Sequence, residues 1–118
     1  MPRNPADIVR NYYELVDADK VDDLVALFHD EVVYERQGTP EINGKAALRR
    51  FYEEERIIAE GSHRLGSVLT DGDWVAVRGR FEGTLTNGDP VEIRFTDWHR
   101  FRDGLIDRRE TLFPGRRV

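Results

Sequence analysis

The segment at positions 91–101, VEIRFTDWHRF, constrains the fold of this chain more than any other stretch. It is rich in β-branched and aromatic residues, and turn-forming pairs flank it, Asn87-Gly88 before and Asp103-Gly104 after. This pattern predicts a long strand with a hairpin turn at each end. Because side chains alternate along a strand, one face carries the odd-numbered residues. These are Val91, Ile93, Phe95, Asp97, His99 and Phe101.

Two polar side chains interrupt this otherwise apolar face. Asp97 and His99 lie two residues apart in its middle, between large apolar neighbours. Burying an ionised carboxylate in such surroundings is unfavourable unless the carboxylate is paired, hydrogen-bonded or protonated. The face therefore predicts either a structural polar network or a site of chemistry.

Composition narrows the class of protein. The 118 residues fit one domain, residues 1–118, with a single core. The chain contains no cysteine, which excludes disulfides, thiol catalysis and thiolate metal sites. Its net charge of −5 arises from interspersed acids and bases, and without a basic face we expect no nucleic-acid partner. No apolar run reaches transmembrane length and the N-terminus lacks a signal-peptide core, so we expect a cytoplasmic protein without a membrane partner.

The spacing of apolar residues predicts the order of the elements. Helical spacing favours helices over 6–17 and 21–28, and a third that opens at Asn43-Gly44 and stops before Gly61. A short strand is expected at 32–34. Four further strands are expected at the C-terminal end, at 63–70, 74–85, 91–101 and 105–113.

These elements predict an α+β fold. Three N-terminal helices would cover one face of a strongly curved antiparallel sheet, giving a cone-shaped barrel with a pocket at its mouth. Asp97 and His99 would point into the inner end of this cone. By apolar patterning, the last strand would add Arg109, Thr111 and Phe113 to the pocket.

The strand at 74–85 gives two conflicting indications. A two-residue turn at Asn87-Gly88 would pair Glu82 with Ile93 and turn charged side chains inward. The apolar pattern favours the opposite face, with Val75, Val77 and Phe81 inside. We favour the apolar pattern, which a β-bulge near Gly79 or Gly83 would reconcile with the turn.

Three segments are similar to a known family. They are YYELVD at 12–17, INGKAAL at 42–48 running into Phe51-Tyr52, and DWHRFRDGLI at 97–106. With these segments the chain resembles the nuclear transport factor 2-like (SnoaL-like) superfamily, which includes ketosteroid isomerase. The resemblance implies the cone-shaped fold. It leaves the activity open, because this fold hosts isomerases, cyclases, epoxide hydrolases, dehydratases and non-catalytic binders.

The resemblance also implies roles for individual residues. Tyr12 falls on the phenol of the oxyanion hole of ketosteroid isomerase, and Asp97 on the carboxylic acid that completes it. Tyr52 falls on a tyrosine that supports this network. The general base, an aspartate in that family, falls on Glu35 or a near neighbour.

Other positions depart from that pattern. Phe28 stands where the family has a helper tyrosine. His99 and Arg109 stand where the isomerase pocket has apolar groups, which argues against a bulky steroid as substrate.

Three functions follow as hypotheses. The first is cofactor-free acid–base chemistry of the isomerase or cyclase kind on a small, partly apolar carbonyl compound, with Tyr12, Asp97 and Glu35 as principal groups and His99 close by. The second is an epoxide hydrolase or dehydratase in which Asp97, Arg109 and Glu35 activate water. The third is a binding domain without turnover, in which Asp97 and His99 satisfy each other.

The expected site has no metal ion and no cofactor, because the three histidines are scattered and no phosphate-binding loop is present. A small molecule is the expected ligand, and a second copy of the chain is expected to bind the outer sheet face. The residues expected to line the pocket are Phe28, Phe51, Tyr52, His63, Phe95, Arg109, Thr111 and Phe113.

Overall fold

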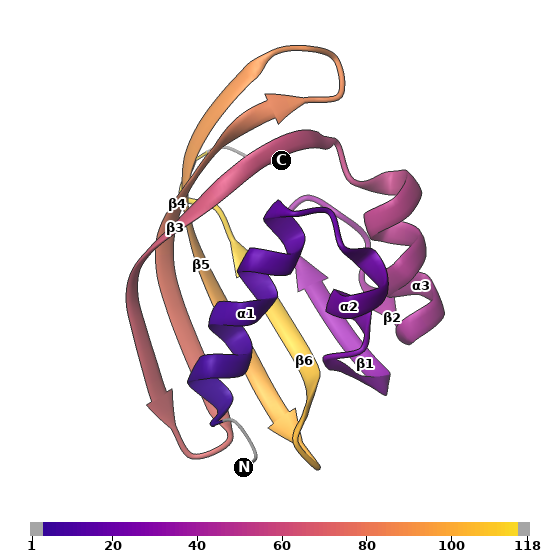
Figure 1. Cartoon of the computed structure of the whole chain (residues 1–118), viewed down its shortest axis with the longest axis vertical. Helices are drawn as coiled ribbons and strands as arrows, with labels where there is room; N and C mark the ends of the chain where they lie inside the picture. The colour runs from indigo at the N-terminus through magenta and orange to yellow at the C-terminus, as the bar shows by residue number, and fades with distance from the viewer. Residues whose placement is uncertain (1–3, 116–118) are drawn as a thin grey trace.

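The computed structural model describes residues 4–115, which form three α-helices, a π-helical turn and one six-stranded sheet (Figure 1). Helix α1 (Pro5–Asp17) begins where the sequence predicts. The Asn4 side chain accepts a hydrogen bond from the backbone N–H of Asp7 at 2.9 Å, and Pro5 occupies the first turn. The buried stripe of α1 consists of Val9, Tyr12, Tyr13 and Val16.

The next two helices are shorter than predicted. Helix α2 (Val21–Val25) gives way to strand β1 (Phe28–Arg36), so Phe28 lies on a strand and pairs with Ile106. Phe28 is completely buried because its backbone pairs with the last strand. This long-range pairing could not be predicted from the helical spacing of the apolar residues.

Helix α3 (Lys45–Arg50) continues into the π-helical turn η1 (Phe51–Glu55) and ends there. Gly61 is therefore not its stop. It lies in strand β3 (Ile58–Asp71) opposite Gly83, where a Cβ atom would lie 2.3 Å from the ring of Phe81. Gly61 is needed for this close approach of two strands and not for the end of a helix.

The sheet confirms the predicted α+β class. Its strand order is β2-β1-β6-β5-β4-β3, with β1 and β6 parallel and the other neighbours antiparallel. The sheet curls around α1 but does not close, because β2 and β3 remain as its edges (Figure 1). The remaining strands are β2 (Ile42–Asn43), β4 (Trp74–Leu85), β5 (Pro90–Arg102) and β6 (Leu105–Leu112).

The turn between β4 and β5 resolves the conflict over the inward face of β4. The Leu85 N–H donates to the Asp89 carbonyl at 2.8 Å, so the loop contains three residues, 86–88, and not two. Gly88 adopts φ +93° at the left-handed position that such loops require. Phe81 consequently pairs with Ile93 and faces inward, as the apolar pattern predicts, and the β4–β5 register runs without a bulge.

A bulge in β6 sets the register that matters for the site. Between Ile106 and Arg108 the pairing with β5 shifts by one residue, leaving Asp107 as the extra residue. The shift allows Ile106 and Arg109 to face inward together. As a result, His99 lies opposite Arg109 and Asp97 lies opposite Thr111.

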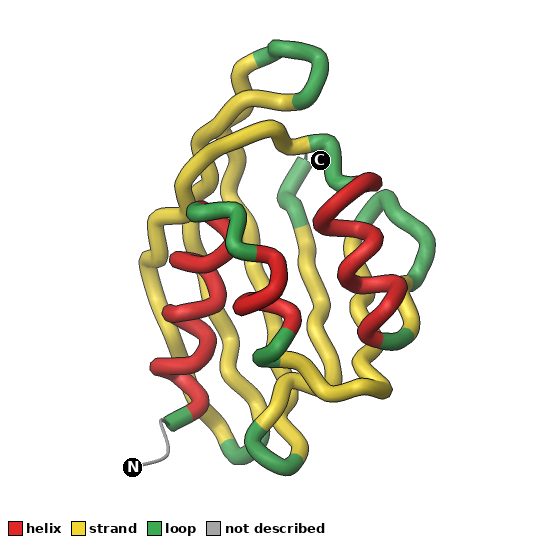
Figure 2. The backbone as a smooth tube through the Cα atoms, turned by 45° about the vertical axis from the view of Figure 1, so that its right-hand side comes forward, coloured by secondary structure: helices red, strands yellow, loops and turns green. Residues whose placement is uncertain are grey.

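The helices occupy one side of the strands, and the core lies between the two layers (Figure 2). Helix α1 crosses the concave face of the sheet, and α3 packs beside β1 and β2 (Figure 1). Within residues 4–115, no helix is both long and apolar enough to cross a membrane.

Candidate functional site

The polar residues on the inner face of β5 and β6 form one buried cluster. Asp97 is 1% exposed, His99 is not exposed at all, and Arg109 and Thr111 are 4% and 3% exposed. Tyr13 from α1 and Tyr34 from β1 complete the cluster. The two polar residues predicted on one strand therefore belong to a network contributed by four elements.

Asp97 is an ionised carboxylate in this cluster. Its Oδ2 lies 2.8 Å from Arg109 Nη2 and accepts a 2.5 Å hydrogen bond from the Tyr13 hydroxyl. Its Oδ1 accepts from the Thr111 hydroxyl at 2.6 Å. Burial alone would raise the pKa of Asp97, but the Arg109 cation and these hydrogen bonds outweigh it and lower the pKa. Asp97 therefore accepts hydrogen bonds and, unlike the neutral acid that the resemblance implies, donates none.

Arg109 is the centre of the cluster. Its Nη1 donates to the Tyr34 hydroxyl and its Nε donates to His99 Nε2 at 3.2 Å. The guanidinium carbon also lies 4.7 Å from the ring centres of Tyr12 and Tyr34, a cation–π geometry. Burial would lower the pKa of Arg109, but the Asp97 carboxylate raises it well above its ordinary value, so the cation is retained.

His99 is neutral and both of its ring nitrogens are engaged. Because Arg109 Nε can only donate, His99 Nε2 is the acceptor, and Nδ1–H donates to the Val75 carbonyl at 3.2 Å. Burial, followed by the Arg109 cation, lowers the pKa of His99 to about 3. In this arrangement neither nitrogen is available to a ligand.

A directional chain of hydrogen bonds joins Tyr34 to Asp97. The single proton of the Thr111 hydroxyl goes to Asp97, so the 2.9 Å contact between Tyr34 and Thr111 has Tyr34 as donor. Tyr34 in turn accepts from Arg109 and, at 3.0 Å, from Arg36. Burial would raise the pKa of Tyr34, but these two cations lower it. Tyr34 is thus the most acidified phenol of the cluster.

The structure does not pair Tyr12 with Asp97. The Tyr12 hydroxyl bonds to that of Tyr52, and burial raises its pKa well above the ordinary value. Tyr13, the next residue of α1, provides the phenol on Asp97. Sequence reasoning missed Tyr13 and Tyr34. For Tyr34 the sequence gave no clear signal, because Val32 and Val33 are both apolar and alternation along the strand favours neither face.

Glu35 lies outside the site. Tyr34 faces inward, so alternation turns Glu35 to the outer sheet face, where its side chain is 48% exposed and paired with Arg108. The expected position of Glu35 in the pocket is therefore wrong. The acid–arginine–acid arrangement consequently lacks its second acid.

A small cavity of about 20 Å³ opens beside Asp97, enough for one water molecule. Among the described residues its only carboxylate is Asp97. Of the residues expected to line the pocket, His63, Phe95, Arg109, Thr111 and Phe113 do so, whereas Phe28, Phe51 and Tyr52 do not. The full lining is Arg36, Arg56, Ile58, His63, Phe81, Ile93, Phe95, Asp97, Arg109, Thr111 and Phe113.

A larger groove of about 230 Å³ adjoins this cavity. Arg36 lines both, and its guanidinium carbon lies 5.2 Å from the ring centre of Phe51 and 5.0 Å from that of Phe113. Phe51 lines the groove instead of the cavity. The groove is lined by Arg36, Gln37, Gly38, Thr39, Phe51, Glu55 and Ile57.

His63 enters the cavity wall from β3 and contacts the end of α1. The Asp17 carboxylate accepts from the His63 backbone N–H at 2.8 Å and lies 2.6 Å from His63 Nδ1. The side chains of His63 and Asp17 are 11% and 23% exposed. The sequence indicated His63 as a lining residue but gave no sign of Asp17.

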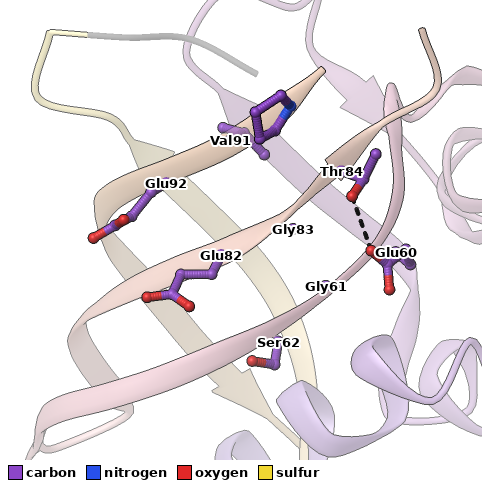
Figure 3. A pocket seen from close by; sticks show the side chains of 9 residues that line it. Glu60, Gly61, Ser62, Glu82, Gly83, Thr84, Val91 and Glu92 are labelled. Atoms are coloured by element: carbon purple, nitrogen blue, oxygen red, sulfur yellow. Dashed lines mark hydrogen bonds between the residues drawn. The ribbon is translucent and has the colours of Figure 1, made fainter. Parts of the chain in front are cut away.

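Another hollow, of about 740 Å³, lies elsewhere, over β3, β4 and β5 (Figure 3). Glu60, Glu82 and Glu92 line it, and the Thr84 hydroxyl donates to Glu60 at 2.9 Å. It shares no lining residue with the Asp97 cavity. We therefore assign the candidate site to the interior cavity. No group of three or more metal-binding side chains occurs within residues 4–115.

Comparison with known proteins identifies the family. A model of the SnoaL-like domain matches residues 9–109. The chain belongs to the SnoaL-like family. Among curated proteins, none matches the chain in sequence.

Solved structures of this NTF2-like fold are similar to the chain over most of its length. SalBIII, an epoxide hydrolase/cyclase-like enzyme in pyran ring formation in the polyether salinomycin, is 26% identical, with a TM-score of 0.81 over 92% of this chain and 89% of SalBIII. An LEH-like epoxide hydrolase from M. tuberculosis is 17% identical, with a TM-score of 0.80 over 92% and 80%. A protein with a ketosteroid isomerase-like fold from Catenulispora acidiphila, in complex with trimethylamine, is 15% identical, with a TM-score of 0.83 over 98% and 91%. At 15% and 17% identity, the last two structures show only that this chain has the same fold.

Proposed function

We propose that this SnoaL-like protein is a cofactor-independent acid–base enzyme, of the isomerase or cyclase kind, acting on a small, partly apolar carbonyl compound. The observation that carries the proposal is the ionised Asp97–Arg109 pair, which faces a cavity with aromatic walls. A buried ion pair gains little over apolar residues of the same size, so its presence favours a chemical role over a purely structural one. An apolar pocket with convergent polar groups of perturbed pKa is the usual setting of such chemistry.

The polar end of the cavity suits a substrate oxygen that gains negative charge. Arg109 and Arg36 both line the cavity and supply fixed cations there. The buried Tyr34 hydroxyl accepts from both arginines and so positions them. Charge that develops on the oxygen would be stabilised by cations already in place. A ligand larger than one water would occupy the groove of about 230 Å³ and reach the cavity past Arg36.

Binding of a naphthol, which mimics a bound enolate, tests this function by fluorescence titration. We expect Tyr34→Phe to weaken binding about tenfold, because Arg109 and Arg36 lose the hydroxyl that positions them and one hydrogen bond to a charged group is worth about this much. Tyr12→Phe is the matched control, because within residues 4–115 the Tyr12 hydroxyl bonds to Tyr52 and Tyr12 does not line the cavity. Absence of binding, or equal affinity of all three proteins, would leave a domain without an oxyanion site and refute the proposal.

A second candidate is the addition or removal of water. The cavity holds about one water molecule beside Asp97 and Arg109, and SalBIII is the similar structure of highest identity cited above. Ionised Asp97 would then take a proton from that water as the water oxygen bonds to an epoxide carbon. The epoxide C–O bond would break, and its electron pair would remain on an alkoxide oxygen near the Arg109 cation. Incorporation of ¹⁸O from labelled solvent into the product would favour this reaction over isomerisation.

We further propose a homodimer through the outer sheet face, in the cytoplasm. Trp98 and Leu112 are 44% and 53% exposed on this face, and the Trp74 and Trp98 rings lie 6.4 Å apart. Exposed apolar groups that gather on a sheet face are typical of protein interfaces. Sedimentation should give a dimer for the wild type and a monomer for Trp98→Glu. A monomeric wild type would rule the dimer out.

A further inference from the structure

We propose that His63, held by Asp17, is the general base of the site and takes a proton from a carbon next to a substrate carbonyl. This inference rests on the proposed function and deepens it, because it supplies the base that Glu35 does not. In the step, the C–H bond breaks, the proton passes to His63 Nε2, and the electron pair moves to the carbonyl oxygen as an enolate. The same imidazolium then returns the proton to another carbon.

The first support is the way Asp17 fixes the imidazole. One carboxylate oxygen of Asp17 accepts from the His63 backbone N–H at 2.8 Å, and the other lies 2.6 Å from Nδ1. A carboxylate accepts, so Nδ1 carries the proton and the ring is the Nδ1–H tautomer. Nε2 is left with its lone pair, which is the state a general base requires.

The second support is the accessibility of Nε2. The contacts of His63 include no hydrogen bond to Nε2, and no buried side-chain polar atom of residues 4–115 lacks a partner. It follows that Nε2 is not sealed in the core. His63 also lines the cavity beside Asp97, which places its imidazole at the wall of the candidate site.

The third support is the arrangement of the base relative to the oxyanion end. The ring of Tyr13 lies 5.1 Å from that of His63, while its hydroxyl bonds to Asp97. Phe95 and Phe81 enclose the other sides of the imidazole, with ring centres at 5.4 and 4.7 Å. The base and the Asp97–Arg109 pair therefore line one small cavity whose wall is partly aromatic and partly charged.

The charge state of His63 is compatible with this role. Burial lowers its pKa below the ordinary value of 6.5, although the hydrogen bond to Asp17 acts in the opposite direction. The charge of Asp17 also raises the pKa of His63, whereas the nearby Arg56 cation lowers it and Asp97 raises it. The net effect keeps His63 neutral at pH 7 and ready to accept a proton.

The same contacts would also fit a structural link between α1 and β3, so the test has to separate the two roles. The probe is 5-nitrobenzisoxazole, from which a base removes the C–H proton while the N–O bond breaks and the electron pair leaves as a coloured phenolate. We expect the wild type to accelerate this reaction with a rate that is constant near pH 7 and falls only at a pH below 6.5, where His63 takes up its proton. His63→Gln should lower kcat/KM at least 100-fold, in the range of general base catalysis.

Two variants sharpen the test. Asp17→Asn should lower the rate and shift the pH profile, because the positioning carboxylate is lost while His63 remains. Glu35→Gln, on the outer face, should leave rate and profile unchanged. A loss of activity with Glu35→Gln, or an unchanged profile with Asp17→Asn, would overturn the assignment.

Naphthol binding separates failure of this inference from failure of the proposed function. If naphthol binds with the expected dependence on Tyr34 but probe turnover is absent, or equal in wild type and His63→Gln, the base assignment is wrong and the oxyanion site stands. If turnover depends on His63 but naphthol does not bind, the base stands and the oxyanion site is wrong. Ring ¹⁵N spectra that show a protonated Nε2 at pH 7 would overturn the inference for a correctly folded protein.

Discussion

Replacing His99 by glutamine should remove much of the acid sensitivity of this fold. Burial, together with the Arg109 cation, lowers the pKa of His99 from 6.5 to about 3. Between these values the unfolded chain binds a proton that the folded chain does not, so stability rises with pH through the window. Above pH 6.5 the free energy of unfolding has its full value with respect to His99, and this stability is lost as the pH falls toward 3.

The size of the effect follows from this difference. With one pKa unit equivalent to about 1.4 kcal/mol, His99 should cause a loss of about 2 kcal/mol between pH 7.5 and 5, and about 4 kcal/mol by pH 3. Glutamine retains a donor for the Val75 carbonyl and an acceptor for Arg109 Nε but does not titrate. His99→Gln should therefore weaken the dependence of the free energy of unfolding on pH, whatever its effect on the absolute stability.

Urea unfolding at several pH values between 5 and 7.5 measures this slope. The comparison of slopes removes any constant loss from imperfect packing of the new side chain. His63→Gln should flatten the curve less, because Asp17 opposes the lowering of the pKa of His63. His99→Gln with the slope of the wild type would show that His99 is not a buried neutral imidazole, and the account of the cluster would be refuted.

Three further predictions concern the buried ion pair, the close approach of β3 and β4, and the outward position of Glu35. Arg109→Met leaves the Asp97 carboxylate buried without its cation and should lower the free energy of unfolding by about 3–5 kcal/mol at pH 7, as measured by urea titration. The deficit should shrink on acidification, and a constant deficit would contradict the ionised state of Asp97. Gly83→Ala places a Cβ 2.2 Å from a backbone carbonyl and should reduce Tm more than Gly66→Ala, where the nearest atom is 3.2 Å away; equal Tm values would contradict this geometry. Glu35→Gln removes an exposed ion pair and should change stability by less than about 1 kcal/mol, so a larger loss would argue against its outward position.

Local patterns in the sequence were sufficient for the fold class and for the inward face of β5. The alternation around Asp97 and His99 holds in the structure because a strand buried on one face cannot shift by one residue without exposing its apolar side chains. The apolar pattern also predicted the correct inward face of β4, whereas a two-residue turn at Asn87-Gly88 would have predicted the opposite face. A hairpin loop adds a residue at little energetic expense, whereas inverting a strand would bury its charges.

The local sequence did not decide which side chains of β1 face the core. The short strand expected at 32–34 did not reach position 35, and only pairing with β6 shows that Tyr34 faces inward and Glu35 outward. The choice of Tyr13 over Tyr12 as partner of Asp97 likewise depends on how α1 lies across the sheet. Both residues belong to the same buried stripe, so helical periodicity predicts burial for both and does not indicate which one contacts Asp97.

The sequence by itself determined a curved α+β domain of the SnoaL-like kind with Asp97 and His99 on an inner strand face. Only the tertiary structure decided which groups meet them. Arg109 reaches Asp97 through a bulge in β6, and Asp17 reaches His63 across 46 positions of chain. Such contacts depend on register and on the docking of a helix, which are set by the packing of the whole core and not by the residues near each partner.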